Sequence, residues 1–146
     1  MLVNGKNYKT LWLENDTVNI IDQTKLPFKF EIKKLVTLKN FCDAISKMEV
    51  RGAPLIGVTA AYGLATGIKK LPNDYNIEDA YNRLFNTRPT AVNLVWSLNI
   101  LKKKLLEAPI SERKKIAFKI CDKILKDDLK SSYQIAKNGF EIIKDF

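Results

Sequence analysis

Apolar and polar residues alternate in short runs near the start of the chain. Residues 8–13 (YKTLWL) and 17–22 (TVNIID) flank a polar turn at 14–16, a pattern that predicts a β-hairpin. Residues 28–32 alternate in the same way and predict a third strand. Because a sheet of this size is not stable alone, we expect it to pack on helices.

The apolar spacing becomes helical after residue 36. Thr37 is the expected N-cap of a helix that runs to about Met48, and residues 77–85 predict a shorter amphipathic helix. Another helix is expected to follow Pro89 and to reach about Glu107. Its apolar positions include Val92, Val95, Trp96, Leu98, Leu101 and Leu105.

The last part of the chain, residues 112–146, keeps a helical pattern with an apolar face that continues through Tyr133 and Phe140. It is one helix or two, because Asp127 and Asp128 are suitable caps for a second. The elements together predict an α+β fold that is mostly α, with a small N-terminal antiparallel sheet packed on a helical bundle. We expect a single domain over residues 1–146, with the sheet at about 1–35 and the bundle at 36–146.

Residues 48–67 (MEVRGAPLIGVTAAYGLATG) stand out because no charged residue occurs between Arg51 and Lys69. Pro54 suits the first turn of a helix, and a helix that is apolar on every side is expected to be buried. An arginine then lies at the N-terminus of a buried helix, where free N–H groups and the helix dipole favour an anion. The alternative is a packed helix that merely follows a surface arginine.

A second arginine directly precedes a proline at Arg88-Pro89, again before a predicted helix. If the two helices converge, Arg51 and Arg88 are the right residues to share one phosphate, since guanidinium groups bind phosphate bidentately. Thr90 and Asn93 are either ligand contacts or local caps. We expect Arg83 to occupy an ordinary helix position and Arg113 to lie on a lysine-rich helix surface.

The composition indicates a globular protein, with 46% hydrophobic and 28% charged residues. The net charge of +9 comes from lysines that alternate with acidic residues, which favours a solvated surface over a nucleic-acid interface. We expect no nucleic acid and no membrane among its partners. The start of the chain lacks the apolar run of a signal peptide, so we expect a cytoplasmic protein.

Candidate catalytic groups are scarce. Cys42 and Cys121 lie at helical core spacing and are expected to be reduced core thiols. The chain has no histidine, which excludes His-based metal sites and Ser-His triads within it, and we expect neither metal nor cofactor. Asp22 is the one early carboxylate in a distinctive setting, and capping of a turn explains it.

Three ordered motifs extend over most of the chain: IDQTKLP at 21–27, VRGAPLIG at 50–57 with AAYG at 60–63, and TRPTAVNL at 87–94. They resemble the N-terminal half of the methylthioribose-1-phosphate isomerase family, which acts in methionine salvage. Residues 127–143 also resemble the helix that closes this half. That family shares a superfamily with the regulatory subunits of the eukaryotic translation initiation exchange factor.

The resemblance implies conversion of an aldose 1-phosphate, methylthioribose 1-phosphate, to the ketose methylthioribulose 1-phosphate. It assigns substrate binding to Arg51, Gly52, Ala53 and Arg88. The family's catalytic cysteine lies in a Thr-His-Cys-Asn-type loop, which has no counterpart here, and its catalytic aspartate and Rossmann-like C-terminal domain are also without one. The resemblance thus places no catalytic residue in this chain.

We therefore expect the chain to be inactive alone, as a truncated product, one part of a split enzyme or an isolated domain. The expected partners are a sugar phosphate and either a second copy or the missing C-terminal half. Two alternatives remain open within the superfamily: a non-catalytic regulatory module, and half of a ribose-1,5-bisphosphate isomerase.

Overall fold

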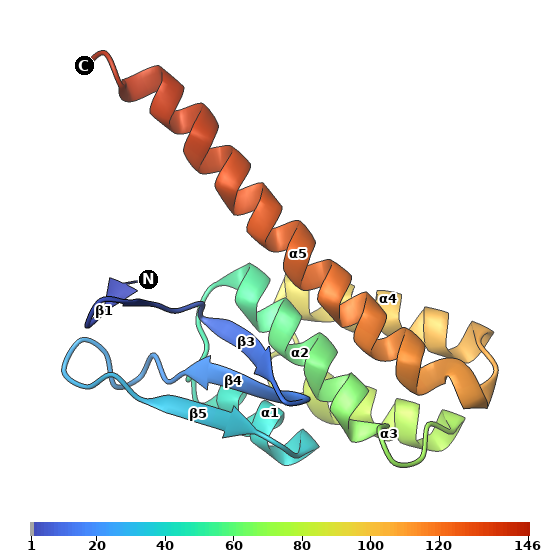
Figure 1. Cartoon of the computed structure of the whole chain (residues 1–146). Helices are drawn as coiled ribbons and strands as arrows, with labels where there is room; N and C mark the ends of the chain where they lie inside the picture. Colours follow the sequence, from blue (N-terminus) through green and yellow to red (C-terminus); the bar gives the residue numbers. More distant parts are fainter. Residues whose placement is uncertain (1) are drawn as a thin grey trace.

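Two small antiparallel sheets and five helices make up residues 2–146, the part of the chain that this computed structural model describes (Figure 1). The strands are β1 (Leu2–Val3), β2 (Lys6–Asn7), β3 (Leu11–Glu14), β4 (Thr17–Ile21) and β5 (Ile32–Leu35). The helices are α1 (Leu38–Ser46), α2 (Ala53–Gly67), α3 (Asp74–Phe85), α4 (Val92–Glu107) and α5 (Ile110–Ile143). The predicted class, a mostly helical α+β fold with a small N-terminal antiparallel sheet, is confirmed.

The hairpin predicted from the alternating runs is β3–β4, in which Leu11 lies opposite Ile20. The third strand, β5, begins at Ile32, so the prediction of a strand at residues 28–32 was wrong. Phe28 is 96% exposed, whereas Leu35 lies opposite Val18 and is buried. Alternation alone does not make a strand: β5 (IKKL) does not alternate, and it forms because it pairs with β4 and places Leu35 in the core.

Side-chain caps set the starts of two helices. Thr37 caps α1 as predicted: its hydroxyl accepts a hydrogen bond from the Asn40 backbone N–H, and the Asn40 side chain accepts one from the Thr37 N–H. Asn73 caps α3, accepting from the Asn76 N–H at 2.8 Å. That cap starts α3 at Asp74, three residues before the predicted start at 77.

Helix α2 is the centre of the bundle and packs against α1, α3, α4 and α5 (Figure 1). Its residues 56–65 are all buried, as the uncharged sequence predicted. Its small residues permit this crowding. A Cβ on Gly63 would lie 2.9 Å from the Cβ of Phe41 in α1 and 3.0 Å from Leu84 in α3.

Two apolar positions predicted for the next long helix are not in the core. Val92 and Trp96 of α4 are 77% and 53% exposed, so not every apolar position of this helix faces the bundle. The buried stripe instead combines Ser97 with four leucines: Leu94, Leu98, Leu101 and Leu105. Apolarity alone does not identify the stripe, because a small serine occupies one of the inward positions.

Arg113 is not the surface residue that its lysine-rich neighbourhood predicted. Its side chain is 6% exposed and lies at the junction of α5 with the start of α3. It donates to the Ala108 and Pro72 carbonyl oxygens and to the Asp74 carboxylate. Arg83 does occupy an ordinary exposed position, 3.6 Å from Asp79 in the same helix.

Helix α5 is continuous over 34 residues, which decides between the one-helix and two-helix alternatives. Ala117 and Cys121 in its first part are buried in the core. Its second part extends beyond the rest of the molecule (Figure 1), where Tyr133 and Phe140 are 70% and 60% exposed. Within residues 2–146, no helix is long and apolar enough to span a bilayer.

Candidate phosphate-binding site

The N-terminal turns of α2 and α4 are in direct backbone contact. A Cβ on Gly57 of α2 would lie 2.8 Å from the carbonyl oxygen of Asn93 in α4. Ser97 strengthens the same contact, because its hydroxyl donates to the Gly57 carbonyl oxygen at 2.8 Å. Only glycine permits this approach, so the sequence of α2 sets its distance from α4.

The two helices also run in the same direction. Helix α3 lies antiparallel to each of them. Along α2, Gly63 lies near Leu84 and Gly67 near Ala80 of α3; along α4, Asn99 contacts Tyr81 and Lys102 contacts Glu78. The N-termini of α2 and α4 therefore lie at one end of the bundle. The convergence on which the shared-phosphate hypothesis depends is present in the backbone.

Neither of these N-termini has a side-chain cap. The N-cap of α2 is Gly52 and that of α4 is Ala91, and neither position provides a capping side chain, whereas α1 and α3 have one each. Helix α5, which starts after Pro109, also lacks one. The first N–H groups of α2 and α4 are thus free to donate to an anion, and both helix dipoles favour negative charge there.

The residues just before Arg51 are fixed to the rest of the domain. Val50 is fully buried, and the carbonyl oxygen of Glu49 accepts a hydrogen bond from the Gln23 N–H at 2.9 Å. The buried Glu49 carboxylate receives the ammonium group of Lys33 from β5, at 2.7 and 2.8 Å from its two oxygens. Arg51 follows directly, in an exposed position. The sheet therefore positions the start of α2.

Gly52 follows Arg51 with φ +94° and ψ 131°. This backbone conformation is available almost only to glycine, because a Cβ clashes with the backbone there. It turns the chain into α2 without blocking the free N–H groups. The backbone conformation therefore explains why glycine occupies position 52, which the family resemblance assigns to substrate binding.

Arg88 lies one turn before α4 rather than at its first residue. The Ala91 N–H donates to the Arg88 carbonyl oxygen at 3.0 Å, which closes a turn that includes Pro89, and the helix begins at Val92. Arg88 is half-buried. Within residues 2–146 neither Arg51 nor Arg88 forms an ion pair with a carboxylate. Both charges remain available to an anionic ligand.

A pocket of about 310 Å³ lies beside these helix ends. Asn93 contributes to it, together with Pro54, Gly57, Val58, Trp96, Ile124, Asp127, Asp128 and Ser131. Neither arginine is in that lining, and the two aspartates oppose a phosphate. This pocket is therefore a less suitable place for an anion than the uncapped helix N-termini. Thr90 is exposed, and neither it nor Asn93 caps α4.

The other groups considered from the sequence have structural roles. Asp22 is buried and accepts from the Thr24 N–H at 3.0 Å and from its hydroxyl at 2.6 Å, which caps a turn as expected. Burial raises the pKa of the Cys42 thiol and raises that of Cys121 further. Both cysteines are therefore protonated and poor nucleophiles at neutral pH.

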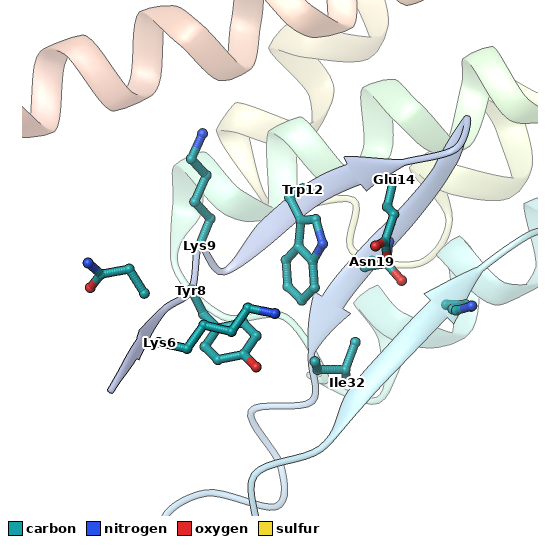
Figure 2. Close-up of a pocket in the computed structure, with 9 residues that line it drawn as sticks. Lys6, Tyr8, Lys9, Trp12, Glu14, Asn19 and Ile32 are labelled. Carbon is teal, nitrogen blue, oxygen red and sulfur yellow. The ribbon is translucent and has the colours of Figure 1, made fainter. Parts of the chain in front are cut away.

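A larger pocket, of about 550 Å³, lies on the outer face of the three-stranded sheet (Figure 2). Trp12, Asn19 and Lys34 contribute to it from neighbouring positions on β3, β4 and β5, and Tyr8 forms one side. Neither Arg51 nor Arg88 lines it, and no residue of α2 or α4 does. Within the described part of the chain, no three His, Cys, Asp or Glu residues are grouped as metal ligands.

Two residues important to the site were missed from the sequence. Glu49 is adjacent to the arginine motif, and a lone carboxylate just before an otherwise uncharged stretch was a usable signal. Lys33 is sixteen positions away, and nothing in its sequence context marks it as the partner of Glu49. Only the register of β5 brings the two together.

Comparison with known proteins shows the family to which the chain belongs. The profile of the initiation factor 2 subunit family matches residues 49–146. Methylthioribose-1-phosphate isomerases from Escherichia coli O45:K1 and Brucella anthropi are 44% and 42% identical to this chain, over 99% of its length. The chain spans only 40% of the length of each of these relatives.

Two solved structures share the fold. The 5-methylthioribose 1-phosphate isomerase from Pyrococcus horikoshii has a TM-score of 0.76 and 38% identity, over 84% of this chain and 37% of its own. The translation initiation factor eIF-2B subunit delta from A. fulgidus also has a TM-score of 0.76, with 30% identity, over 84% of this chain and 38% of its own. The chain belongs to the initiation factor 2 subunit family.

Proposed function

We propose that this chain is the substrate-holding part of a methylthioribose-1-phosphate isomerase and binds the sugar phosphate at the paired N-termini of α2 and α4. The observation that carries the proposal is the backbone contact of Gly57 with Asn93, which joins two uncapped helix ends. Identity of 44% with an isomerase over nearly the whole chain supports the choice of substrate.

Each assigned residue has a physical role in this proposal. Arg51 and Arg88 donate charge-assisted hydrogen bonds to the phosphate from the two sides. The N–H groups of Gly52 and Ala53 point to it from the first turn of α2, where the dipole adds a favourable field. The backbone that carries Arg51 is held in place for the ligand by the Glu49–Lys33 ion pair and by the buried Val50.

Isomerisation of an aldose to a ketose requires groups that move a proton or a hydride between C1 and C2 of the sugar. The residues proposed here bind and orient the phosphate, which positions the sugar but breaks no bond. We infer that the catalytic groups lie in the part of the relatives that this chain does not span. We infer also that the chain alone does not convert methylthioribose 1-phosphate to the ketose.

The experiment is a calorimetric titration of the purified chain with methylthioribose 1-phosphate, with methylthioribose as the matched control that lacks the phosphate. Binding of the phosphate ester without binding of the free sugar is the expected result. A parallel assay for methylthioribulose 1-phosphate is expected to give the rate of buffer. Failure to bind the ester contradicts the site, and ketose formation contradicts the inference that the chain is inactive alone.

A regulatory module is the second candidate, because the eIF-2B delta structure matches this chain with the same TM-score as the isomerase structure. The higher identity to the isomerase, 38% against 30%, favours the first proposal. A module of this kind has no requirement for a sugar phosphate, so the same titration separates the two candidates.

A further inference from the structure

The pocket of about 310 Å³ beside the helix N-termini begins where the proposed phosphate site ends. Pro54 is the second residue of α2 and Asn93 is the second residue of α4, and both line the pocket. The N–H groups assigned to the phosphate belong to Gly52 and Ala53, directly before Pro54. A phosphate ester held there has its sugar beside Pro54 and Asn93, within reach of this pocket.

Helix α5 supplies the third side of the pocket. Four of its residues line it, and they are separated by three, one and three positions: Ile124, Asp127, Asp128 and Ser131. Residues three and four positions apart lie on the same face of a helix. One face of α5 therefore presents first an apolar side chain and then three polar ones to the pocket.

The polar end of that face is at the same end of the bundle as the helix N-termini. Helix α5 runs antiparallel to α2 (Figure 1). Tyr62, late in α2, donates to the Asp122 carboxylate, whereas Pro54, at the start of α2, shares the pocket with Asp127 and Asp128. The two carboxylates of the pocket are thus close to the site proposed for the phosphate.

The pocket combines an apolar wall with hydrogen-bond acceptors. Trp96 of α4, Val58 of α2 and Ile124 contribute the apolar part. Neither Asp127 nor Asp128 forms an ion pair within residues 2–146. Their carboxylates accept strong hydrogen bonds from hydroxyl groups but repel a phosphate. The lining therefore suits an uncharged group that has hydroxyls and an apolar end.

The sugar part of methylthioribose 1-phosphate has this chemistry. Its ribose ring carries hydroxyl groups next to the carbon that bears the phosphate, and a methylthio group at the far end. A thioether packs favourably against an aromatic ring, and a carboxylate can accept from neighbouring hydroxyls. The volume of about 310 Å³ is at the lower end of the range of small-molecule sites, about 300–1,000 Å³.

We propose that this pocket is the subsite for the methylthioribose end of the substrate. Trp96 packs on the methylthio group, and Asp127 and Asp128 accept hydrogen bonds from the ribose hydroxyls. The helix N-termini attract the phosphate while the carboxylates repel it, so the ester binds in one orientation. This inference rests on the proposed function and gives it its specificity, because a phosphate grip alone accepts any phosphate monoester.

The test is calorimetric titration of the full chain with three ligands: methylthioribose 1-phosphate, ribose 1-phosphate and inorganic phosphate. Ribose 1-phosphate has a hydroxyl in place of the methylthio group, and inorganic phosphate lacks the sugar. We expect methylthioribose 1-phosphate to bind about tenfold more tightly than ribose 1-phosphate, as for burial of one small apolar group. Inorganic phosphate is expected to bind more weakly than both.

Variants of Trp96 test the apolar wall. Trp96→Ala is expected to abolish the preference for methylthioribose 1-phosphate over ribose 1-phosphate and to leave inorganic phosphate unaffected. Trp96→Phe keeps an aromatic face and is expected to retain most of the preference. Trp12→Ala, on the outer face of the three-stranded sheet, is the matched control and leaves all three affinities unchanged. Urea unfolding of each variant serves as the folding control.

The double variant D127N/D128N tests the acceptors. We expect it to bind methylthioribose 1-phosphate and ribose 1-phosphate about tenfold more weakly, since hydrogen bonds to a charged group are lost. It is expected to bind inorganic phosphate as tightly as the wild type or more tightly, because a repulsion is removed. The matched control D16N/D145N loses two carboxylates elsewhere and is expected to change the two sugar phosphates by less than twofold.

The outcomes separate this subsite from the phosphate site. A wild type that binds all three ligands, with Trp96→Ala and D127N/D128N unchanged in their preferences, overturns the subsite and leaves the phosphate site in place. Losses of equal size for both sugar phosphates and inorganic phosphate also overturn it, because they indicate a structural effect. A wild type that binds none of the ligands contradicts the phosphate site, and this inference with it.

Discussion

Gly57 of α2 lies so close to Asn93 of α4 that no methyl group fits between the two backbones. A Cβ placed on Gly57 would be 2.8 Å from the Asn93 carbonyl oxygen and 3.1 Å from its carbon, and both atoms belong to a helix backbone that has no room to move aside. The spacing of the two helix N-termini, and hence of the proposed phosphate site, depends on this one missing side chain.

Gly57→Ala is therefore expected to destabilise the fold by about 1–3 kcal/mol, the usual cost of overpacking. Urea unfolding measures it. Gly139→Ala is the matched control, because Gly139 lies in α5 with open space around its Cβ position, and there the substitution is expected to stabilise slightly. Equal midpoints for the two variants would contradict the close approach of α2 and α4.

Gly52→Ala is expected to destabilise by about 1–3 kcal/mol for a different reason, since its φ is +94° while the space around it is open. Asparagine often substitutes for glycine in the left-handed helical region, but the ψ of 131° places Gly52 outside it. We therefore expect Gly52→Asn to unfold at the same urea concentration as Gly52→Ala. A clear rescue by asparagine would show that the backbone adopts the left-handed helical conformation instead.

Arg113→Met is expected to cost about 2–4 kcal/mol, because it leaves the Pro72 and Ala108 carbonyl oxygens without their donor in a buried junction. Arg83→Met, at an exposed site of α3, is the matched control and is expected to change stability by less than about 0.5 kcal/mol. Thermal unfolding of both variants provides the comparison. A small effect at Arg113 would show that water replaces the guanidinium there.

Stability is expected to fall in alkaline solution. Tyr62 is fully buried and donates to the Asp122 carboxylate at 2.5 Å, and burial raises its pKa far above the ordinary value of 10.0; burial also raises that of Cys121 above 9.0. The unfolded chain therefore loses these protons before the folded chain does. By linkage the stabilisation is complete below pH 9 and declines as the pH rises past 9 and 10.

The measurement for this prediction is the urea midpoint from pH 7 to pH 11. Cys121→Ala and Tyr62→Phe are each expected to reduce the alkaline slope while lowering stability at neutral pH, since each also removes a core contact. Tyr133→Phe, at an exposed site, controls for loss of a hydroxyl. A flat profile in the wild type would show that Tyr62 and Cys121 are accessible to hydroxide.

The sequence predicted the helices better than the sheet, because local signals determine helix ends. Thr37 and Pro54 mark the starts of α1 and α2, and a run without charge marks α2 as buried. The strand after the hairpin was misplaced because residues 28–32 alternate, whereas β5 (IKKL) does not; β5 is a strand because it pairs with β4 and buries Leu35. Hydrophobic periodicity in the sequence does not show which side chains pack against the core.

The candidate site was predicted in part. The two arginine-proline motifs identified both helix starts, but their convergence depends on Gly57 fitting against Asn93, which no local pattern contains. The tie between Glu49 and Lys33 also joins segments that are distant in sequence. Arg113 was misassigned because its lysine-rich neighbourhood was taken to indicate exposure, whereas tertiary packing buries its side chain.

The central claim is that Arg51 and Arg88 hold one phosphate between them, and a double-mutant cycle in methylthioribose 1-phosphate binding tests it most directly. Arg51→Ala and Arg88→Ala are each expected to weaken binding by about 1.5–3 kcal/mol, as for a lost charge-assisted hydrogen bond. Since both would contact the same group, the double variant should lose less than the sum, by about 0.5 kcal/mol or more. Arg83→Ala controls for net charge. Unchanged affinity in both single variants would contradict the account.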